Sequence, residues 1–384
     1  MTSTARAQDV IVVGAGVIGL SIAWQQARLG NPVHVVDRAT SGAGASGVPW
    51  GALWPTAATK NGLGHRLHRE SLWQFETFVR ELEEASGLSI GFNRPGRLEL
   101  LSNDSRRQAA IRESQAAQQY WPTFSNEPVQ RVLTRKEALE LEPAVTVEDW
   151  GALACDASAC VDTGTLLAAL RSSIIRQGGV IDDDSEVRDL WIDGNRVCGV
   201  VTDRPIPARS VVVAGGAWTS SIAPELAAST DIVPVKGEVI ILQSKEKLFS
   251  RILKRSRTYM IPLPAGRVLV GSTSYPDAGF DSVPTEEGRD ALFASAVSMV
   301  PALSSAKIES QWVGHRPQSI SKSPYLGEVP GTARLYVASG HFKIGLAMAP
   351  VVGQLMGKIL DGEPIEHDLS VFQPGRPPRT SSLK

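Results

Sequence analysis

Three closely spaced glycines and an acidic residue after them form the clearest chemical pattern in the chain. Gly14, Gly16 and Gly19 give the pattern G-x-G-x-x-G, directly after the apolar run Val10–Val13 and before a helical pattern. The first glycine allows a tight turn, the second lets a pyrophosphate approach the backbone, and the third lets helix and strand pack closely. Asp37 ends the next strand-like run, at roughly the distance where a ribose-binding acid stands. The segment predicts a dinucleotide-binding turn rather than an ordinary glycine-rich turn.

Two further segments are expected beside the same nucleotide. Residues 39–47 are small and directly follow the acid, which suits a backbone that wraps an extended cofactor; a mobile surface loop is the alternative. The strand-like run 210–214, with three successive valines, is followed by two glycines, the first of them Gly215. Ligands bind at the carboxyl ends of strands in doubly wound sheets, so Gly215 is expected to face the cofactor.

Composition and charge exclude several other classes of protein. The 384 residues are 42% hydrophobic and 21% charged, with a formal net charge of −1, which gives no support for nucleic acid or an anionic membrane as partner. Cys155, Cys160 and Cys198 lack metal-like spacing and indicate no disulfide framework and a reducing compartment. The first apolar run is broken by glycines, so neither a signal peptide nor a membrane span is predicted, and we expect a cytoplasmic protein without a metal site.

The order of the predicted elements indicates an α/β protein with two domains. A Rossmann-type domain that is discontinuous in sequence is expected, with a second, α+β domain built on an antiparallel sheet. Closely spaced strand-like runs between 232 and 273 support that sheet, and a strand followed by a helix over 334–360 returns to the first domain. The expected bounds are 1–87, 151–228 and 312–370 for the first domain, 88–150 and 229–311 for the second, and 371–384 for a flexible tail.

Four later segments, taken with the opening one, carry a family resemblance. The strand-like run 233–238, Tyr259, the run 313–317 and the run 340–345 follow in an order that resembles the D-amino-acid oxidase superfamily of flavoproteins, and within it the glycine oxidase branch of bacterial thiamine synthesis. The resemblance covers nearly the whole chain. It implies FAD in the Rossmann-type domain and a substrate domain whose antiparallel sheet roofs the flavin.

The resemblance, together with the glycine turns, gives a set of expected FAD contacts. They fall on the first turn and its acid, on the loop and strand after it, on one residue near the adenine, and on the run that leads into the last helix. The set is Gly14, Ala15, Gly16, Val17, Ile18, Gly19, Asp37, Arg38, Ala45, Ser46, Trp50, Gly51, Ala52, Val187, Gly215, Gly340, His341, Phe342, Lys343, Ile344, Gly345, Leu346 and Ala347.

Two features of this site bear on how the flavin is held. A helix that begins at Gly345 would direct unpaired N–H groups toward the flavin pyrimidine, where charge develops on reduction; capping by solvent is the alternative. His65 and His68 are expected to be solvated helix residues rather than metal ligands or points of flavin attachment. Because Cys155 and Cys160 also lie outside the regions expected beside the flavin, noncovalent FAD is predicted.

The same resemblance implies a carboxylate clamp made by Tyr259 and Arg316. The Arg316 guanidinium is a planar fork that can hold both oxygens of an α-carboxylate, and the Tyr259 hydroxyl can add a donor. An internal ion pair for Arg316 and a plain sheet aromatic for Tyr259 are the alternatives. The chemistry implied is oxidation of an amino-acid amine to an imine by hydride transfer to flavin N5, followed by hydrolysis, with O2 as acceptor.

Departures from the glycine oxidase pattern bear on the substrate. Arg257 precedes Tyr259 by two residues, so on a strand both side chains would share a face. Lys343 replaces an arginine, and Ala52 replaces a bulkier side chain. The hypothesis is a substrate larger than glycine, with a second anionic group reached by Arg257 or Lys343; the alternative is that both cations point to solvent.

Other functions stay open on the sequence alone. A dehydrogenase could pass electrons to a quinone or partner protein, the same flavin could act on a 2-hydroxy acid, and a flavin-binding subunit could be structural within a larger enzyme. A homo-oligomer is compatible with the sequence but is not predicted by it.

Overall fold

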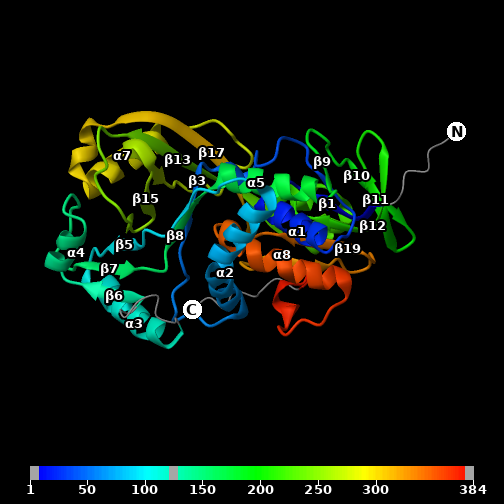
Figure 1. Ribbon diagram of the computed structural model, residues 1–384, viewed down its shortest axis with the longest axis horizontal. Helices are drawn as coiled ribbons and strands as arrows, with labels where there is room; N and C mark the ends of the chain where they lie inside the picture. The colour runs from blue at the N-terminus through cyan, green and yellow to red at the C-terminus, as the bar shows by residue number, and fades with distance from the viewer. Residues whose placement is uncertain (1–7, 121–128, 377–384) are drawn as a thin grey trace.

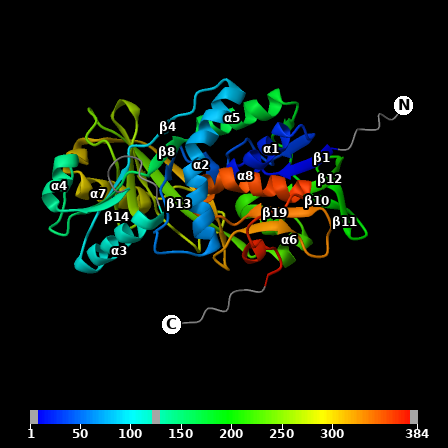
Figure 2. The same cartoon turned by 60° about the horizontal axis from the view of Figure 1, so that its bottom comes forward.

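The computed structural model describes residues 8–120 and 129–376, which form an elongated molecule with one large sheet in each half (Figures 1 and 2). Helices lie on both halves, and α2 runs between them in Figure 1. The helices in these ranges are α1 (Val17–Arg28), α2 (Leu63–Ser86), α3 (Asp104–Tyr120), α4 (Arg135–Leu141), α5 (Thr163–Arg176), α6 (Pro224–Ser229), α7 (Glu286–Met299) and α8 (Gly345–Asp361).

The first sheet has a parallel centre that is buried on both faces. Its parallel strands run in the order β9 (Val180–Asp182), β2 (Val33–Val36), β1 (Gln8–Val13), β12 (Pro205–Val213) and β19 (Leu335–Ser339). Ile11 and Val12, neighbours that point to opposite faces, are both fully buried, which is why the strand is a continuous apolar run. Antiparallel strands extend the sheet: β10 (Asp189–Asp193) and β11 (Arg196–Val201) beside β12, and β18 (Tyr325–Glu328) beside β19.

Helix α1 packs between α5 and α8 over the parallel strands. Val17 and Leu20 of α1 and Ala347 and Val351 of α8 belong to one apolar cluster with the strand residue Val12. Burial of this common face holds the two helices whose first turns open toward the carboxyl ends of the strands.

The second sheet has eight strands, in the order β17 (Lys307–Ser319), β13 (Ile232–Gln243), β16 (Arg267–Gly271), β15 (Thr258–Pro262), β14 (Ile252–Arg255), β5 (Arg97–Leu100), β7 (Ala152–Cys155) and β6 (Gln130–Leu133). The expected antiparallel pairing holds for all neighbours except β14 and β5, which are parallel. A small third sheet, β3 (Trp50–Leu53), β8 (Ala159–Asp162) and β4 (Phe92–Asn93), lies between the halves.

Two segments expected in the first domain belong to the second sheet. Strand β7 follows the expected boundary at 151 and pairs with β5 and β6, and β17 crosses the expected boundary at 312. Strand β17 crosses this boundary because it pairs with β13 along its whole length, from Lys307 to Ser319. These long paired strands, β13 and β17, span both halves of the molecule.

The end of the described chain is packed rather than extended. Of the expected tail 371–384, Phe372 is 3% exposed, and the Arg376 guanidinium donates to the carbonyl oxygens of Ser323 and Pro324 and to the Ser321 hydroxyl. Residues 377–384 lie outside the described residues. Each helix within 8–120 and 129–376 is too short or too polar to cross a membrane.

Candidate active site

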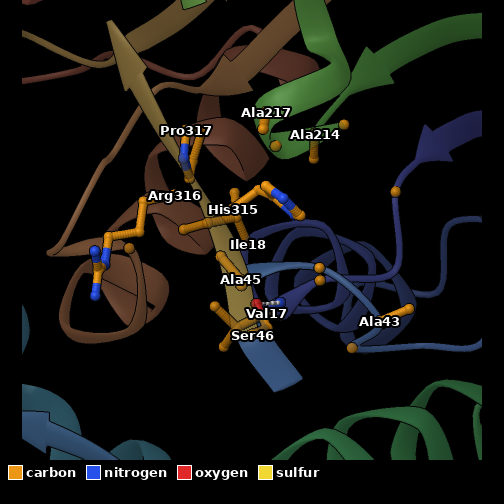
Figure 3. Close-up of a pocket in the computed structure, with 18 of the residues that line it drawn as sticks. Val17, Ile18, Ala43, Ala45, Ser46, Ala214, Ala217, His315, Arg316 and Pro317 are labelled. Atoms are coloured by element: carbon orange, nitrogen blue, oxygen red, sulfur yellow. Dashed lines mark hydrogen bonds between the residues drawn. The ribbon is translucent and has the colours of Figure 1, made fainter. Parts of the chain in front are cut away.

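A cavity of about 670 Å³ runs from the first glycine turn to the second sheet (Figure 3). Its nucleotide end is lined by Gly14, Gly16, Val17, Ile18, Asp37 and Arg38, and by Ala45 and Ser46 of the loop. Its other end is lined by Tyr259, Arg316 and Lys343. One continuous cavity therefore brings together residues expected to bind a nucleotide and residues expected to bind a substrate.

Asp37 holds the first turn in place. Its carboxylate oxygens accept hydrogen bonds from the Ala15 amide at 2.6 Å and from the Ala39 amide at 3.0 Å. Burial raises the pKa of Asp37, and these two hydrogen bonds oppose that rise. Because the Ala15 amide is used in this way, Ala15 supports the turn from behind and does not line the cavity.

The glycines of the turn bring α1 against the sheet. Gly14 has φ +113°, a conformation that side chains rarely adopt, and a Cβ atom on Gly19 would overlap the Gly14 carbonyl oxygen. Gly16 begins α1 without a side-chain cap, and the Val17 amide donates to the Ser46 hydroxyl at 3.0 Å, the dashed line in Figure 3. The helix N-terminus therefore faces the cavity and suits an anionic group.

The opposite wall at this end comes from two turns. Gly215 lines the cavity where β12 ends, and Val187 lines it from the loop between β9 and β10 rather than from a strand. Trp218, on the turn after Gly215, also lines the cavity, with the Arg38 guanidinium 4.0 Å from its ring centroid. Sequence reasoning missed Trp218; its position three residues after Gly215 was the available signal.

The run before α8 closes the middle of the cavity. His341, Phe342, Lys343, Gly345 and Leu346 line it. Gly340, Ile344 and Ala347 do not; they form the turn and the helix behind. From β3, Trp50, Gly51 and Ala52 line the cavity.

Two observations at this run fit FAD. Helix α8 begins at Gly345 with no side-chain cap, so its first N–H groups are free of side-chain acceptors where the cavity opens. The Nε2 atom of His341 is buried without a hydrogen-bond partner, although His341 lines the cavity. Such an atom needs a partner from a bound molecule or water. The glycine turn, Asp37 and this helix end are the groups that would hold FAD, whose flavin supplies an acceptor for two electrons.

Arg316 and Tyr259 meet at the end of the cavity in the second sheet. The Arg316 Nη1 atom donates to the Thr273 carbonyl oxygen at 3.1 Å, and Figure 3 shows its side chain extending from β17 away from His315. Burial raises the pKa of Tyr259, with the Arg316 charge opposing, so the phenol is protonated and able to donate at neutral pH. Burial lowers the pKa of Arg316, yet a guanidinium stays charged in proteins.

Two glycines make room for this pair. A Cβ atom on Gly237 of β13 would overlap the Arg316 guanidinium, and one on Gly271 of β16 would lie 2.7 Å from the Tyr259 ring. Gly237 is paired with Gly314 of β17, so neither strand carries a side chain at the position where Arg316 lies. Glycine inside a strand marks such a close approach, a signal that sequence reasoning missed.

Replacing Gly237 by alanine in the otherwise wild-type holoenzyme is expected to displace the Arg316 guanidinium. Carboxylate binding should weaken about tenfold or more, because one charge-assisted hydrogen bond is lost. Titration of the flavin absorbance with acetate measures this. In an Arg316→Met background the same Gly237→Ala change is expected to have no further effect. An equal effect in both backgrounds would show that Gly237 does not act through Arg316.

The spacing of Arg257 and Tyr259 predicts that both lie on one strand, but Arg257 does not. It stands in the turn between β14 and β15, because Ser256 has φ +54° and β15 begins only at Thr258. Its side chain is exposed and does not line the cavity. Lys343 does line it, and burial together with the charges of Arg316 and Arg257 lowers the pKa of Lys343.

The expectation that His65 and His68 are solvated is wrong for His68. His68 is 2% exposed, because it faces the core side of α2, and its Nδ1 atom has no partner. Burial, with the charges of His65 and Arg69, lowers the pKa of His68 to about 4, and burial alone lowers the pKa of His341 to about 4. Both imidazoles are neutral in the folded protein at pH 7.

Acidification is therefore expected to unfold the apoprotein more easily. Both folded-state pKa values lie below the ordinary 6.5, so the unfolded chain binds more protons and stability is lost as the pH falls from about 6.5 toward 4. Each histidine is worth at most roughly 3 kcal/mol over this range. Urea unfolding at a series of pH values measures the slope, which His68→Gln should reduce. An unchanged slope in that variant would contradict the assignment.

Three tryptophans from different segments also line the cavity. Trp54 follows β3, Trp50 lies on it, and Trp312 is on β17. The Trp54 ring packs edge-on against Tyr259, with ring centroids 5.3 Å apart. Trp54 and Trp312 were not expected at the site, since nothing local in the sequence separates them from core aromatics.

Comparison with known proteins agrees with this arrangement. The family profile DAO, described as FAD dependent oxidoreductase, matches residues 9–359. The chain is similar to glycine oxidase of Geobacillus kaustophilus, at 30% identity over 95% of this chain and 96% of the relative, and to glycine oxidase of Pseudomonas aeruginosa, at 31% identity over 93% and 96%.

Solved structures are similar over the same range. The crystal structure of glycine oxidase from Geobacillus kaustophilus superposes with a TM-score of 0.90 at 29% identity, covering 97% of this chain and 100% of the other. That of iminodiacetate oxidase from Chelativorans sp. BNC1 superposes with a TM-score of 0.85 at 27% identity, covering 95% and 98%. The expected fold, family and cofactor are confirmed: the chain belongs to the DAO family of FAD-dependent oxidoreductases.

Proposed function

We propose that this enzyme oxidises the amine of an amino acid to an imine, with O2 as the electron acceptor. Bound FAD supplies an acceptor for the hydride of the substrate Cα–H bond and, on reoxidation by O2, yields H2O2. As the hydride leaves, the nitrogen lone pair forms the C=N bond and a proton leaves the nitrogen. Water then hydrolyses the imine to a carbonyl compound and a free amine or ammonia.

The observation that carries the proposal is the unpaired guanidinium of Arg316 in the cavity. Within the described residues Arg316 has no carboxylate partner, and its Nη1 atom donates to the Thr273 carbonyl oxygen. A guanidinium that is half-buried and still has free N–H donors is suited to bind an anion from solution. Tyr259, protonated at neutral pH, adds a donor to the same carboxylate, and the two together orient the Cα–H bond.

Proton transfer needs no dedicated residue in this proposal. The only carboxylates among the described cavity residues are Asp37 and Glu186, and Asp37 is engaged at the nucleotide end. The substrate amine is therefore proposed to arrive neutral, so that its lone pair is available when the hydride leaves. The relatives named above support an amine as substrate: two are glycine oxidases and one is an iminodiacetate oxidase.

A substrate larger than glycine and a noncovalent cofactor are part of the proposal. Ala52 lines the cavity with a side chain of one carbon, which leaves room beside the clamp. Cys155, Cys160 and Cys198 are unpaired thiols and lie outside the cavity lining. His65 and His68 also lie outside it, so none of the side chains considered for covalent flavin attachment lines the described cavity. Unpaired cysteines also support the proposed cytoplasmic location.

Anaerobic reduction of the bound flavin tests the proposal. A panel of glycine, sarcosine, D-amino acids, cyclic imino acids and dicarboxylic amines, set against 2-hydroxy acids, should bleach the flavin only with amines. Mixing the reduced enzyme with O2 should give H2O2 without another acceptor. Bleaching by hydroxy acids alone would overturn the amine, reoxidation only by a quinone would overturn the oxidase, and no bleaching would favour a structural flavin subunit.

A further inference from the structure

Two cations line the substrate end of the cavity and a third stands in a nearby turn, and none of them has an acid as partner. Arg316 and Lys343 line the cavity, and Arg257 stands in the turn just before Tyr259. Over residues 8–120 and 129–376, none of the three is within ion-pair distance of a carboxylate. Two lysines that are less exposed than Lys343 are matched by acids: Lys236, 1% exposed, lies 2.7 Å from an Asp281 oxygen, and the partly buried Lys254 lies 2.9 Å from a Glu99 oxygen.

The three cations lie at different depths. Arg316 is half-buried over Gly237, whereas Lys343 and Arg257 are exposed to solvent. The Phe342 amide donates to the Pro317 carbonyl oxygen at 2.7 Å, which fixes Lys343 beside the strand that carries Arg316. Burial, and after it the charges of Arg316 and Arg257, lowers the pKa of Lys343, in line with its place beside Arg316 in the cavity wall. One α-carboxylate on Arg316 and Tyr259 would leave two positive charges uncompensated at the mouth.

We propose that Lys343 and Arg257 form a second anion subsite at the mouth of the cavity, so that the preferred substrates are amino acids with two carboxylates. This rests on the proposed function, since Arg316 and Tyr259 hold the first carboxylate. The second carboxylate then points outward, where Lys343 contacts it from the cavity wall and Arg257 attracts it from the turn. Dianions are steered to such a mouth more strongly than monoanions, and salt weakens the attraction.

Two ethers that cannot be oxidised as amines provide the test. Methoxyacetate and oxydiacetate both place an ether oxygen where the substrate nitrogen would lie, and they differ by one carboxylate. Titrating the holoenzyme and following the visible flavin spectrum gives each Kd without turnover. Oxydiacetate is expected to bind about tenfold or more tightly than methoxyacetate at low salt, the contribution of one charge-assisted contact. The preference should shrink as salt is raised.

Variants assign the preference to the two cations. Lys343→Met should remove most of the preference for oxydiacetate over methoxyacetate, because the second carboxylate loses its partner. Arg257→Gln should lower the preference less, and mainly at low salt, because Arg257 is exposed. Lys358→Met, in the last turn of helix α8 and far along the chain from Lys343, is the control for loss of one exposed lysine and should bind both ligands as wild type does.

Each outcome bears on one claim. Equal Kd values for the two ethers, or a Lys343→Met variant that weakens both equally, would overturn the subsite while amine-driven bleaching left the proposed function standing. A preference for oxydiacetate that survives both single replacements and the double one would also overturn it. If neither ether changes the flavin spectrum, the proposed carboxylate clamp is overturned, and the subsite with it.

Discussion

Replacing Arg316 by methionine is expected to lower kcat/KM for the best amino-acid substrate by about 10³-fold. The replaced fork can make two charge-assisted hydrogen bonds to one carboxylate, worth about 1.5–3 kcal/mol each, so the loss spans roughly 10²–10⁴. Rapid-mixing measurement of anaerobic flavin reduction separates the effect into substrate Kd and the rate of reduction. Both should suffer, because the clamp binds the substrate and also orients its Cα–H bond.

Arg316→Lys is the informative control for this prediction. It keeps the charge but loses the planar fork, so it should recover part of the binding and less of the reduction rate. The flavin content of both variants should stay at the wild-type level, because the groups proposed to hold FAD lie elsewhere in the cavity. An Arg316→Met enzyme that is reduced as fast as wild type, with the same substrate Kd, would contradict a role for this side chain in binding.

The second large effect is expected from Gly19→Ala. The new Cβ atom would overlap the Gly14 carbonyl oxygen and lie 3.3 Å from the Ala214 Cβ, so α1 must move away from the sheet. Forcing a methyl group into such a contact costs about 1–3 kcal/mol. The helix N-terminus moves with α1, and losing one or two hydrogen bonds to an anionic group should weaken FAD binding about 100-fold.

Gly64→Ala provides the matched comparison for Gly19→Ala. Gly64 is the second residue of α2, as Gly19 is the third of α1, and an added Cβ would meet only the Phe372 ring at 3.6 Å. Alanine favours helix over glycine by about 1 kcal/mol, so this variant should be as stable as wild type or more so. Thermal unfolding of the apoproteins and FAD titration measure both. Wild-type affinity in Gly19→Ala would show that the close approach is not required.

The first part of the chain could be predicted because its pattern is local. A buried strand, a glycine turn, a helix and an acid follow within residues 10–37, and each has a direct physical cause in neighbouring residues. The second sheet could not be predicted to the same depth. Its β14 and β5 are parallel neighbours although 252–255 and 97–100 are far apart in sequence, and no local pattern encodes that pairing.

The residues of the candidate site could likewise be predicted where their role depends on neighbours in the sequence, and not where it depends on distant strands. Arg316 and Tyr259 were expected through family resemblance and lie at one end of the cavity, but their roles stay predictions until tested. Arg257 was placed on a strand because spacing alone assumes regular backbone, and the left-handed residue Ser256 breaks that assumption. Gly237 was overlooked because its function depends on a side chain that reaches it from another strand.

The interleaving of the first sheet has a consequence for how the enzyme matures in the cell. Its central strand β1 begins at residue 8. Strand β19, which is separated from β1 by β12 alone, and helix α8 are not made until residues 335–361 leave the ribosome. A nascent chain therefore carries the glycine turn long before the wall that completes the cavity exists. Flavin loading must follow release of almost the entire polypeptide, and a chain cut before residue 345 should emerge colourless.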